Sequence, residues 1–148
     1  MPEYVLGHEL KGEEARLALM SELLDPMHRR YIEALNVAKP GARTLEVGCG
    51  NGSISAWLAE RVSLGGTAVA VDLDLSLIHV HMPNLELRKA DIVAGPVERG
   101  PFDLVTARAV LHHVANAETA MANMIASLKP GGALLLIEPD FQIGRAHV

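Results

Sequence analysis

Three alternating glycines directly follow a short apolar segment and could form the turn of a nucleotide-type binding site. The segment spans residues 44–52 and places glycines at positions 48, 50 and 52. Glycine adopts positive φ at low cost and has no Cβ, so the backbone can turn tightly and approach a ligand. Ser53 is suited to cap a helix that continues with apolar residues at helical spacing. A strand, a glycine turn and a helix N-terminus together indicate a nucleotide cradle. Residues 48–52 are called the glycine turn below.

The charge beside the glycine turn indicates which ligand it suits. A dinucleotide fingerprint would have a third glycine where Ser53 stands. Glu46 lies two residues before Gly48, at the mouth of the predicted strand. A carboxylate there would repel a pyrophosphate but would suit a cationic ligand that carries an ammonium and a sulfonium.

A second acidic position follows the next predicted strand. Residues 67–72 are almost wholly apolar, as expected of a parallel strand buried on both faces, and they end in Asp72. Asp72 follows Gly52 by 20 residues, the position from which an acidic side chain can bind the two ribose hydroxyls of an adenosine. Asp74 is expected to be solvated.

The remaining elements alternate between strands and helices. Further strands are predicted at residues 85–90, 102–107 and 133–138, and a helix at 118–128, ended by the segment 129–132. Only a short helix could fit between residues 75 and 82. Before the first strand, residues 13–24 and about 27–35 are predicted to form two helices, separated at Asp25-Pro26.

These features together resemble the class I S-adenosylmethionine-dependent methyltransferases. The resemblance covers roughly residues 44–140 and rests on E-x-G-x-G-x-G at the first turn, F-D-L-V at 102–105 and L-K-P-G-G at 128–132. It implies an α/β Rossmann-like fold with a mainly parallel, doubly wound sheet, and S-adenosylmethionine as the cofactor. Residues 4–7 and 23–26 also resemble an N-terminal extension that closes over the cofactor in some bacterial members, although a helical pair that merely caps the sheet is an equal alternative.

The resemblance also implies site residues. Asp91 would accept a hydrogen bond from the adenine amine, and Ile92 would pack on the ring. Arg108 could contact the cofactor or a substrate carboxylate, with a structural salt bridge as the alternative. The residues expected to bind the cofactor are Glu46, Gly48, Cys49, Gly50, Asn51, Gly52, Asp72, Leu73, Asp91, Ile92 and Arg108.

Catalysis of methyl transfer does not require a nucleophilic side chain, because the cofactor carries the activated carbon. His112 and His113 follow the fourth predicted strand and are candidates for a general base, or else polar residues that support the site. His79 and His81 are not expected to bind a metal, since no cysteine or carboxylate pair accompanies them. Cys49 is interpreted as a small packing residue.

The composition excludes several other classes of protein. The chain has 148 residues, 49% hydrophobic and 21% charged, with a net charge of −5. The absence of a basic run argues against a nucleic-acid partner, and the absence of a long apolar run argues against a membrane span. One cysteine excludes an internal disulfide. We expect a cytoplasmic enzyme that acts on a small-molecule acceptor; an NAD-dependent oxidoreductase and a cofactor-binding module without catalysis are the alternatives.

The expected division of the chain is an N-terminal arm and helical cap over residues 1–36, a cofactor-binding domain over 37–141 and a non-native tail over 142–148. The last residues resemble a translated sequencing adapter, and the family's last two strands would then be missing. Residues 134–137 form an apolar run suited to a central strand. An uncovered edge at that strand predicts self-association of this chain.

Overall fold

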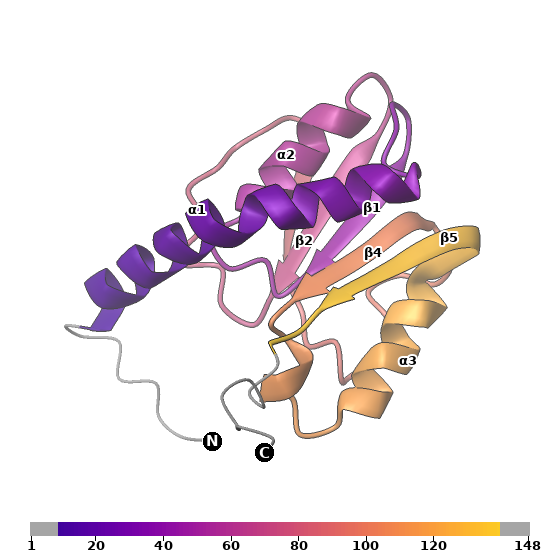
Figure 1. Cartoon of the computed structure of the whole chain (residues 1–148). Helices are drawn as coiled ribbons and strands as arrows, with labels where there is room; N and C mark the ends of the chain where they lie inside the picture. The colour runs from indigo at the N-terminus through magenta and orange to yellow at the C-terminus, as the bar shows by residue number, and fades with distance from the viewer. Residues whose placement is uncertain (1–8, 140–148) are drawn as a thin grey trace, which may run out of the picture.

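The computed structural model describes residues 9–139, with side chains from residue 12 onward. It contains a parallel five-stranded sheet in the order β3-β2-β1-β4-β5. Figure 1 labels β2, β1, β4 and β5 of this sheet. The strands are β1 (Arg43–Val47), β2 (Thr67–Asp72), β3 (Leu85–Lys89), β4 (Phe102–Arg108) and β5 (Leu128–Ile137). The helices are α1 (Glu9–Leu35), α2 (Ser53–Val62) and α3 (Ala117–Ser127), with a short 3₁₀ helix η1 (Leu111–His113).

Helices cover both faces of the sheet. On one face, Ile32 of α1 and Leu58 of α2 pack with Leu104 of β4 in one apolar cluster. On the other face, Met124 of α3 packs with Val105 and other strand residues in a second cluster. Residues on β1 alternate between these faces, because successive side chains of a strand point to opposite sides. This three-layer arrangement is the α/β Rossmann-like class that the sequence predicted.

The N-terminal helices differ from the prediction. Asp25 and Pro26 do not separate two helices; α1 is one helix of 27 residues with Pro26 inside it. Proline removes one intrahelical hydrogen bond and normally kinks or breaks a helix. Here the residues that follow are fixed by burial, since His28 and Ile32 are both fully buried. Tertiary packing therefore outweighs the local signal. The predicted N-terminal arm at residues 4–7 lies outside the described residues.

Three further expectations are corrected. No helix forms between residues 75 and 82, which instead form a turn at residues 76–77 and otherwise irregular chain. The segment 129–132 belongs to β5 rather than to a turn before it, and a register shift against β4 accommodates it. The third strand ends at Lys89 and leaves Ala90 outside.

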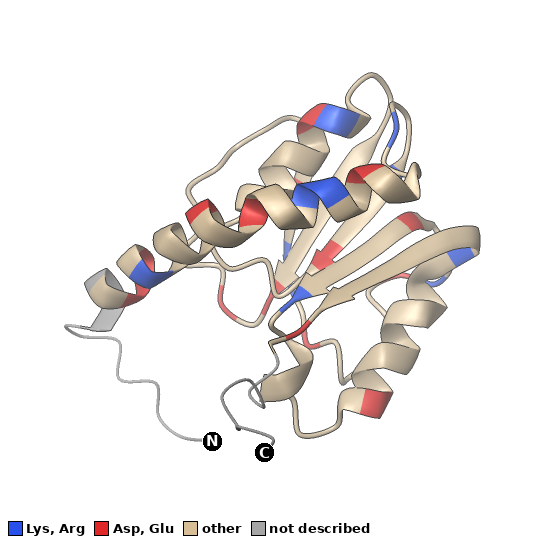
Figure 2. Ribbon diagram, in the orientation of Figure 1, with Lys and Arg blue, Asp and Glu red and all other residues tan. Residues whose placement is uncertain are grey.

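The two edges of the described sheet differ in polarity. The edge strand β3 carries Glu86, Arg88 and Lys89. The other edge, β5, has only Lys129 as a charged residue, and Figure 2 shows most of its length without charge colour. Charged side chains on an edge strand hinder pairing with another sheet, so β3 is the better protected edge.

Candidate functional site

The glycine turn connects the end of β1 to the start of α2. Gly48, Gly50 and Gly52 have φ values of 70°, 56° and 83°, a region that residues with a Cβ rarely adopt. The N–H groups of Gly48 and Cys49 both donate to the carbonyl of Val71, at 2.8 and 3.2 Å. The turn is therefore fixed against β2.

The cap of α2 is not the one predicted. The N-cap is Gly52, and Ser53 is the first helical residue. Asn51 satisfies the N–H of Ser53 through its Oδ1 at 3.1 Å. Ser21 of α1 in turn bonds to Asn51 and to Ser53, so α1 contacts the turn directly.

Apolar side chains lie against two of the glycines. A Cβ at Gly50 would lie 3.5 Å from Leu17 of α1, and a Cβ at Gly48 would collide with Val110. Packing as well as φ therefore excludes a Cβ at Gly48, whereas at Gly50 the positive φ alone disfavours one. Cys49 is buried, and burial, with smaller effects of Glu46 and Asp72, raises the pKa of its thiol. A buried thiol with a raised pKa is a poor nucleophile, and the interpretation of Cys49 as a packing residue stays a prediction.

Glu46 is a residue of β1 whose side chain contacts α2, and it is only 5% exposed. Its Oε1 accepts a hydrogen bond from Ser55 Oγ at 2.6 Å. Burial raises the pKa of Glu46 to about 8, against the opposing hydrogen bond from Ser55 and the charge of Arg108. A carboxyl group was expected here, but its burial was not.

Asp72 lies at the carboxyl end of β2 and faces the glycine turn. Its Oδ2 accepts from the N–H of Gly50 at 3.0 Å. Asp74 is turned away and accepts from the N–H of Ser76 at 2.9 Å, and this hydrogen bond lowers its pKa. Leu73, between them, is 58% exposed. The structure therefore separates the two aspartates as predicted, with only Asp72 at the turn.

Asp91 and Ile92 lie just after β3 and point in different directions. Asp91 is exposed, and its Oδ1 accepts from the N–H of Val93 at 2.9 Å. Ile92 is only 5% exposed and packs in the apolar cluster that contains Val105. The expected contacts of both residues with an adenine remain a prediction.

Arg108 is held by α1. Its Nη1 lies 2.9 Å from Asp25 Oδ1 and 3.2 Å from His28 Nδ1. Asp25 Oδ1 forms no well-aligned hydrogen bond, so this contact is an ion pair by charge alone. His28 Nε2 lies 2.8 Å from Thr106 Oγ1. We call Asp25, His28, Thr106 and Arg108 the α1–β4 polar cluster.

The sequence did not predict the α1–β4 polar cluster. Asp25 was interpreted as the cap of a second helix, and an isolated His28 gave no signal of its own. A continuous helix would have placed Asp25 and His28 on one face, at i and i+3. Burial lowers the pKa of His28 to about 4, with help from the charge of Arg108 and against that of Asp25.

The two candidate histidines lie in η1, at the carboxyl ends of β4 and β5. His112 Nδ1 lies 3.0 Å from Glu138 Oε2, while His113 is exposed. Glu138 also accepts from the N–H of Leu111 at 2.8 Å. Partial burial opposes ionisation of Glu138, but its hydrogen bonds from Leu111 and His112 outweigh burial and lower its pKa. Sequence reasoning did not identify Glu138 as a partner of His112.

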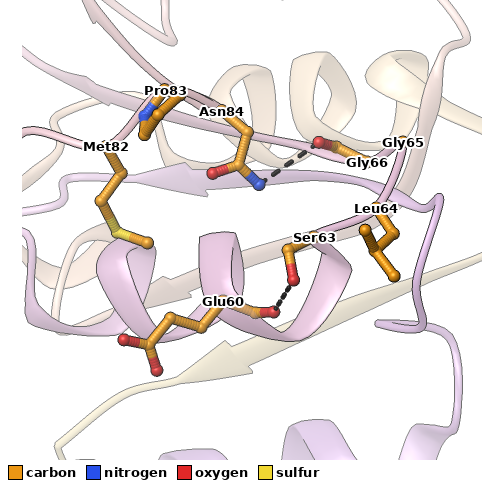
Figure 3. A pocket seen from close by; sticks show the side chains of 8 residues that line it. All are labelled: Glu60, Ser63, Leu64, Gly65, Gly66, Met82, Pro83 and Asn84. Atoms are coloured by element: carbon orange, nitrogen blue, oxygen red, sulfur yellow. Dashed lines mark hydrogen bonds between the residues drawn. The ribbon is translucent and has the colours of Figure 1, made fainter.

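Two hollows on the described residues lie at the other end of the sheet. One, of about 400 Å³, is lined by residues 60, 63–66 and 82–84 (Figure 3). In it Asn84 Nδ2 donates to the carbonyl of Gly66 at 3.3 Å. The other, also about 400 Å³, lies near Asp103 and Lys129. Both adjoin the amino ends of strands, whereas ligands of open parallel sheets bind at the carboxyl ends.

His79 and His81 follow β2. His79 Nε2 lies 3.6 Å from Glu14 Oε1 of α1. Among the residues described, no three His, Cys, Asp or Glu side chains are grouped to hold a metal ion. No helix of the described chain is long and apolar enough to cross a bilayer.

Comparison with known proteins gives a family match over residues 45–136, to the family described as "Methyltransferase domain". The chain is 31% identical over 137 residues to the ubiquinone/menaquinone biosynthesis C-methyltransferase UbiE of Ectopseudomonas mendocina, covering 84% of this chain and 54% of that protein. It is 37% identical over 121 residues to a ubiquinone biosynthesis O-methyltransferase of Xanthomonas campestris, covering 76% and 49%. The chain thus spans about half the length of these relatives.

A solved structure gives the same fold. A SAM-dependent methyltransferase from Aquifex aeolicus superimposes with a TM-score of 0.72 at 20% identity, over 86% of this chain and 71% of the other. At this identity the likeness concerns the fold alone. The family match over residues 45–136 includes the glycine turn and nearly all of the five strands described above.

Proposed function

Since the chain belongs to the methyltransferase-domain family, we propose that it binds S-adenosylmethionine at the glycine turn and serves in methyl transfer to a small-molecule acceptor. The observation that carries this proposal is Glu46, a carboxyl group buried beneath three glycines with positive φ. A dinucleotide would place a negatively charged pyrophosphate at such a turn. A sulfonium with an ammonium group has the opposite charge.

The residues present fit this cofactor. The glycine turn offers a backbone without side chains at positions 48, 50 and 52, all with positive φ, and Asp72 is anchored there by the N–H of Gly50. We propose that Asp72 binds the ribose hydroxyls and that Asp91 binds the adenine amine. Leu73, which is exposed beside Asp72, would gain apolar cover from the nucleoside.

The chemistry divides between cofactor and chain. The cofactor supplies a methyl group activated by its sulfonium. The chain's task is to orient the acceptor and exclude water, and good alignment of two reactants can lower a barrier by roughly 7–11 kcal/mol. His112, held by Glu138, and its neighbour His113 remain the predicted candidates for a base, needed only if the acceptor arrives protonated.

The acceptor is proposed only as a small molecule. One relative is named a C-methyltransferase and another an O-methyltransferase, so the relatives do not agree on the acceptor atom. Both names belong to quinone biosynthesis, which favours an aromatic acceptor as the first to assay. The comparisons give no support to an NAD-dependent oxidoreductase.

Titration calorimetry tests the proposal with S-adenosylmethionine, its demethylated product and NAD. We expect the first two to bind and NAD not to bind. Gly50→Ala and Gly100→Ala form a matched pair, because both glycines have positive φ, 56° and 85°, but only Gly50 lies in the turn. Gly50→Ala should abolish binding and Gly100→Ala should not. NAD binding tighter than S-adenosylmethionine would overturn the proposal.

A further inference from the structure

The carboxyl group of Glu46 has an unusual set of neighbours for an acid at neutral pH. It is 5% exposed, and its hydrogen bond comes from the neutral hydroxyl of Ser55 at 2.6 Å. Within the described residues, no Lys, Arg or His side chain forms an ion pair with it. An ionised carboxylate in such a place is strongly disfavoured unless a cation compensates it.

The two residues directly beside Glu46 in the sheet provide no such cation. In the sheet register Glu46 lies beside Ala70 of β2 and Thr106 of β4. Thr106 Oγ1 donates to the carbonyl of Leu135 at 3.0 Å and contacts His28. These groups are neutral, since burial holds the pKa of His28 at about 4.

Two charged neighbours, Asp25 of α1 and Arg108 of β4, act on Glu46 in opposite directions. Arg108 favours ionisation of Glu46 and Asp25 opposes it, and these two form an ion pair of 2.9 Å with each other. On the side of the glycine turn, Asp72 lies close enough to Cys49 for its charge to raise the pKa of that thiol. A second carboxylate at Asp72 adds negative charge there. The surroundings of Glu46 therefore favour the protonated, neutral form of its carboxyl group.

A cationic ligand at the glycine turn would change this balance. A positive charge near a buried carboxyl group favours its ionised form, and the effect is strong where water is excluded. We propose that binding of S-adenosylmethionine ionises Glu46 and releases its proton to solvent, so that cofactor binding is coupled to pH. This inference rests on the proposed function.

The proton balance is simple. The O–H bond of the Glu46 carboxyl breaks, its electron pair remains on the carboxylate, and the buffer takes the proton. A neutral thioether replaces the sulfonium once a methyl group has been transferred, so the demethylated cofactor provides one positive charge less. Glu46 then takes a proton back from the buffer. The coupling thereby weakens the retention of the product relative to the methyl donor as pH rises.

The test measures protons rather than activity. Calorimetric titrations at pH 7 in two buffers with different ionisation enthalpies give the number of protons released per ligand bound. An acid with a pKa of about 8 is roughly nine-tenths protonated at pH 7, so we expect wild type to release roughly half to nine-tenths of a proton with S-adenosylmethionine. S-adenosylhomocysteine should release clearly less.

Two variants identify the source of the proton. Glu46→Gln keeps the shape and the Ser55 contact but cannot ionise, so its proton release should vanish after the ligand's own amine is accounted for. Glu60→Gln removes an exposed carboxylate at the far end of α2 and should release as wild type does. Release by Glu46→Gln equal to that of wild type would overturn the inference.

Wild type alone provides a second measurement, in case Glu46→Gln fails to fold. The ratio of affinities for S-adenosylmethionine and S-adenosylhomocysteine should rise between pH 6 and pH 8, by up to roughly tenfold per pH unit. A ratio independent of pH, with both ligands bound, would refute the coupling and leave the proposed function standing. Failure of both ligands to bind would refute the proposed function and, with it, the coupling.

Discussion

At the scale of single residues, two carboxyl side chains near the glycine turn differ in burial and in hydrogen bonding. Glu46 and Asp72 lie near the carboxyl ends of neighbouring strands, yet Glu46 is buried with one hydroxyl partner and Asp72 accepts from a backbone N–H of the glycine turn. A hydrogen bond to a carboxylate favours its charged form, whereas burial disfavours it. Sequence position predicts that both are acidic and near the turn, but only the packed structure separates them.

Asp72 and Asp74 provide the first residue-scale prediction. Asp72→Ala should weaken binding of S-adenosylmethionine roughly tenfold to hundredfold, the usual cost of about 1.5–3 kcal/mol for a lost hydrogen bond to a charged group. Asp74→Ala should change affinity little, because Asp74 is turned to Ser76. Calorimetry on both variants is the measurement. Equal affinities would show that the ribose contact has been assigned wrongly.

Glu46 and His28 predict how stability depends on pH. The pKa of Glu46 is raised from 4.5 to about 8, so its contribution is complete below pH 4.5 and is lost as pH rises toward 8. The pKa of His28 is lowered from 6.5 to about 4, so its contribution is present above pH 6.5 and is lost toward pH 4. Between pH 4.5 and 6.5 the two groups change the free energy of unfolding with pH in opposite directions and cancel. Between pH 6.5 and 8 only Glu46 still lowers it as pH rises.

Denaturant unfolding at several pH values checks this expectation. Glu46→Gln should become more stable relative to wild type by about 1.4 kcal/mol for each pH unit up to 8, reaching roughly 3 kcal/mol at pH 7. Glu60→Gln, which removes an exposed carboxylate, should show no such trend. A constant difference between Glu46→Gln and wild type across pH would contradict a buried neutral acid.

At the scale of elements, α1 determines what lies above the carboxyl ends of the strands. It continues through Pro26 because Asp25, His28 and Ile32 are buried against the sheet. Its earlier turns place Leu17 against Gly50 and Ser21 beside Asn51. The α1–β4 polar cluster therefore positions the part of α1 that contacts the glycine turn.

The ion pair of Arg108 with Asp25 should hold α1 in place. Arg108→Met leaves a buried carboxylate without its partner and should destabilise the protein by about 3–5 kcal/mol. Adding Asp25→Asn should recover much of this loss, because the double variant buries no unpaired charge. Denaturant unfolding of both single variants and the double variant measures the coupling. Additive losses would mean that the pair does not act as a unit.

The strands were predicted better than the connections between them. Apolar runs predicted the central strands, because strands buried on both faces have such sequences, whereas the alternation of apolar and charged residues predicted β3. The continuity of α1 could not be predicted, since Pro26 is a helix-breaking signal that long-range packing outweighs. Gly131, with a φ of 84°, similarly looked like a turn and lies within β5.

At the scale of the whole molecule, the order of the strands gathers the candidate site. The parallel sheet brings the carboxyl ends of β1 to β4 to the same end of the sheet. It thereby places residues 46, 72, 91 and 108 at that end, although they are far apart in sequence. Sequence resemblance predicted this gathering. The partner of Arg108 could not be predicted, because it depends on where α1 crosses the sheet.

The same architecture leaves two edges in the described sheet, and their difference leads to the last prediction. Leu134, Leu135, Leu136 and Ile137 of β5 are only half-buried, and no described strand pairs with the outer side of β5. An apolar edge with unpaired backbone groups is a template for association. We therefore expect the 148-residue chain to self-associate as its concentration rises.

Sedimentation velocity over a range of concentrations measures this association. A variant on α1 tests the other exposed apolar surface: Leu23 is 66% exposed and Leu19 56%, so Leu23→Lys introduces a charge there without touching β5. Self-association should persist in Leu23→Lys, because backbone pairing at β5 does not use that side chain. Loss of association in this variant would assign it to α1 instead. A monomeric, cooperatively unfolding chain at all concentrations would show that β5 is a tolerated edge, protected by its own twist and partial burial.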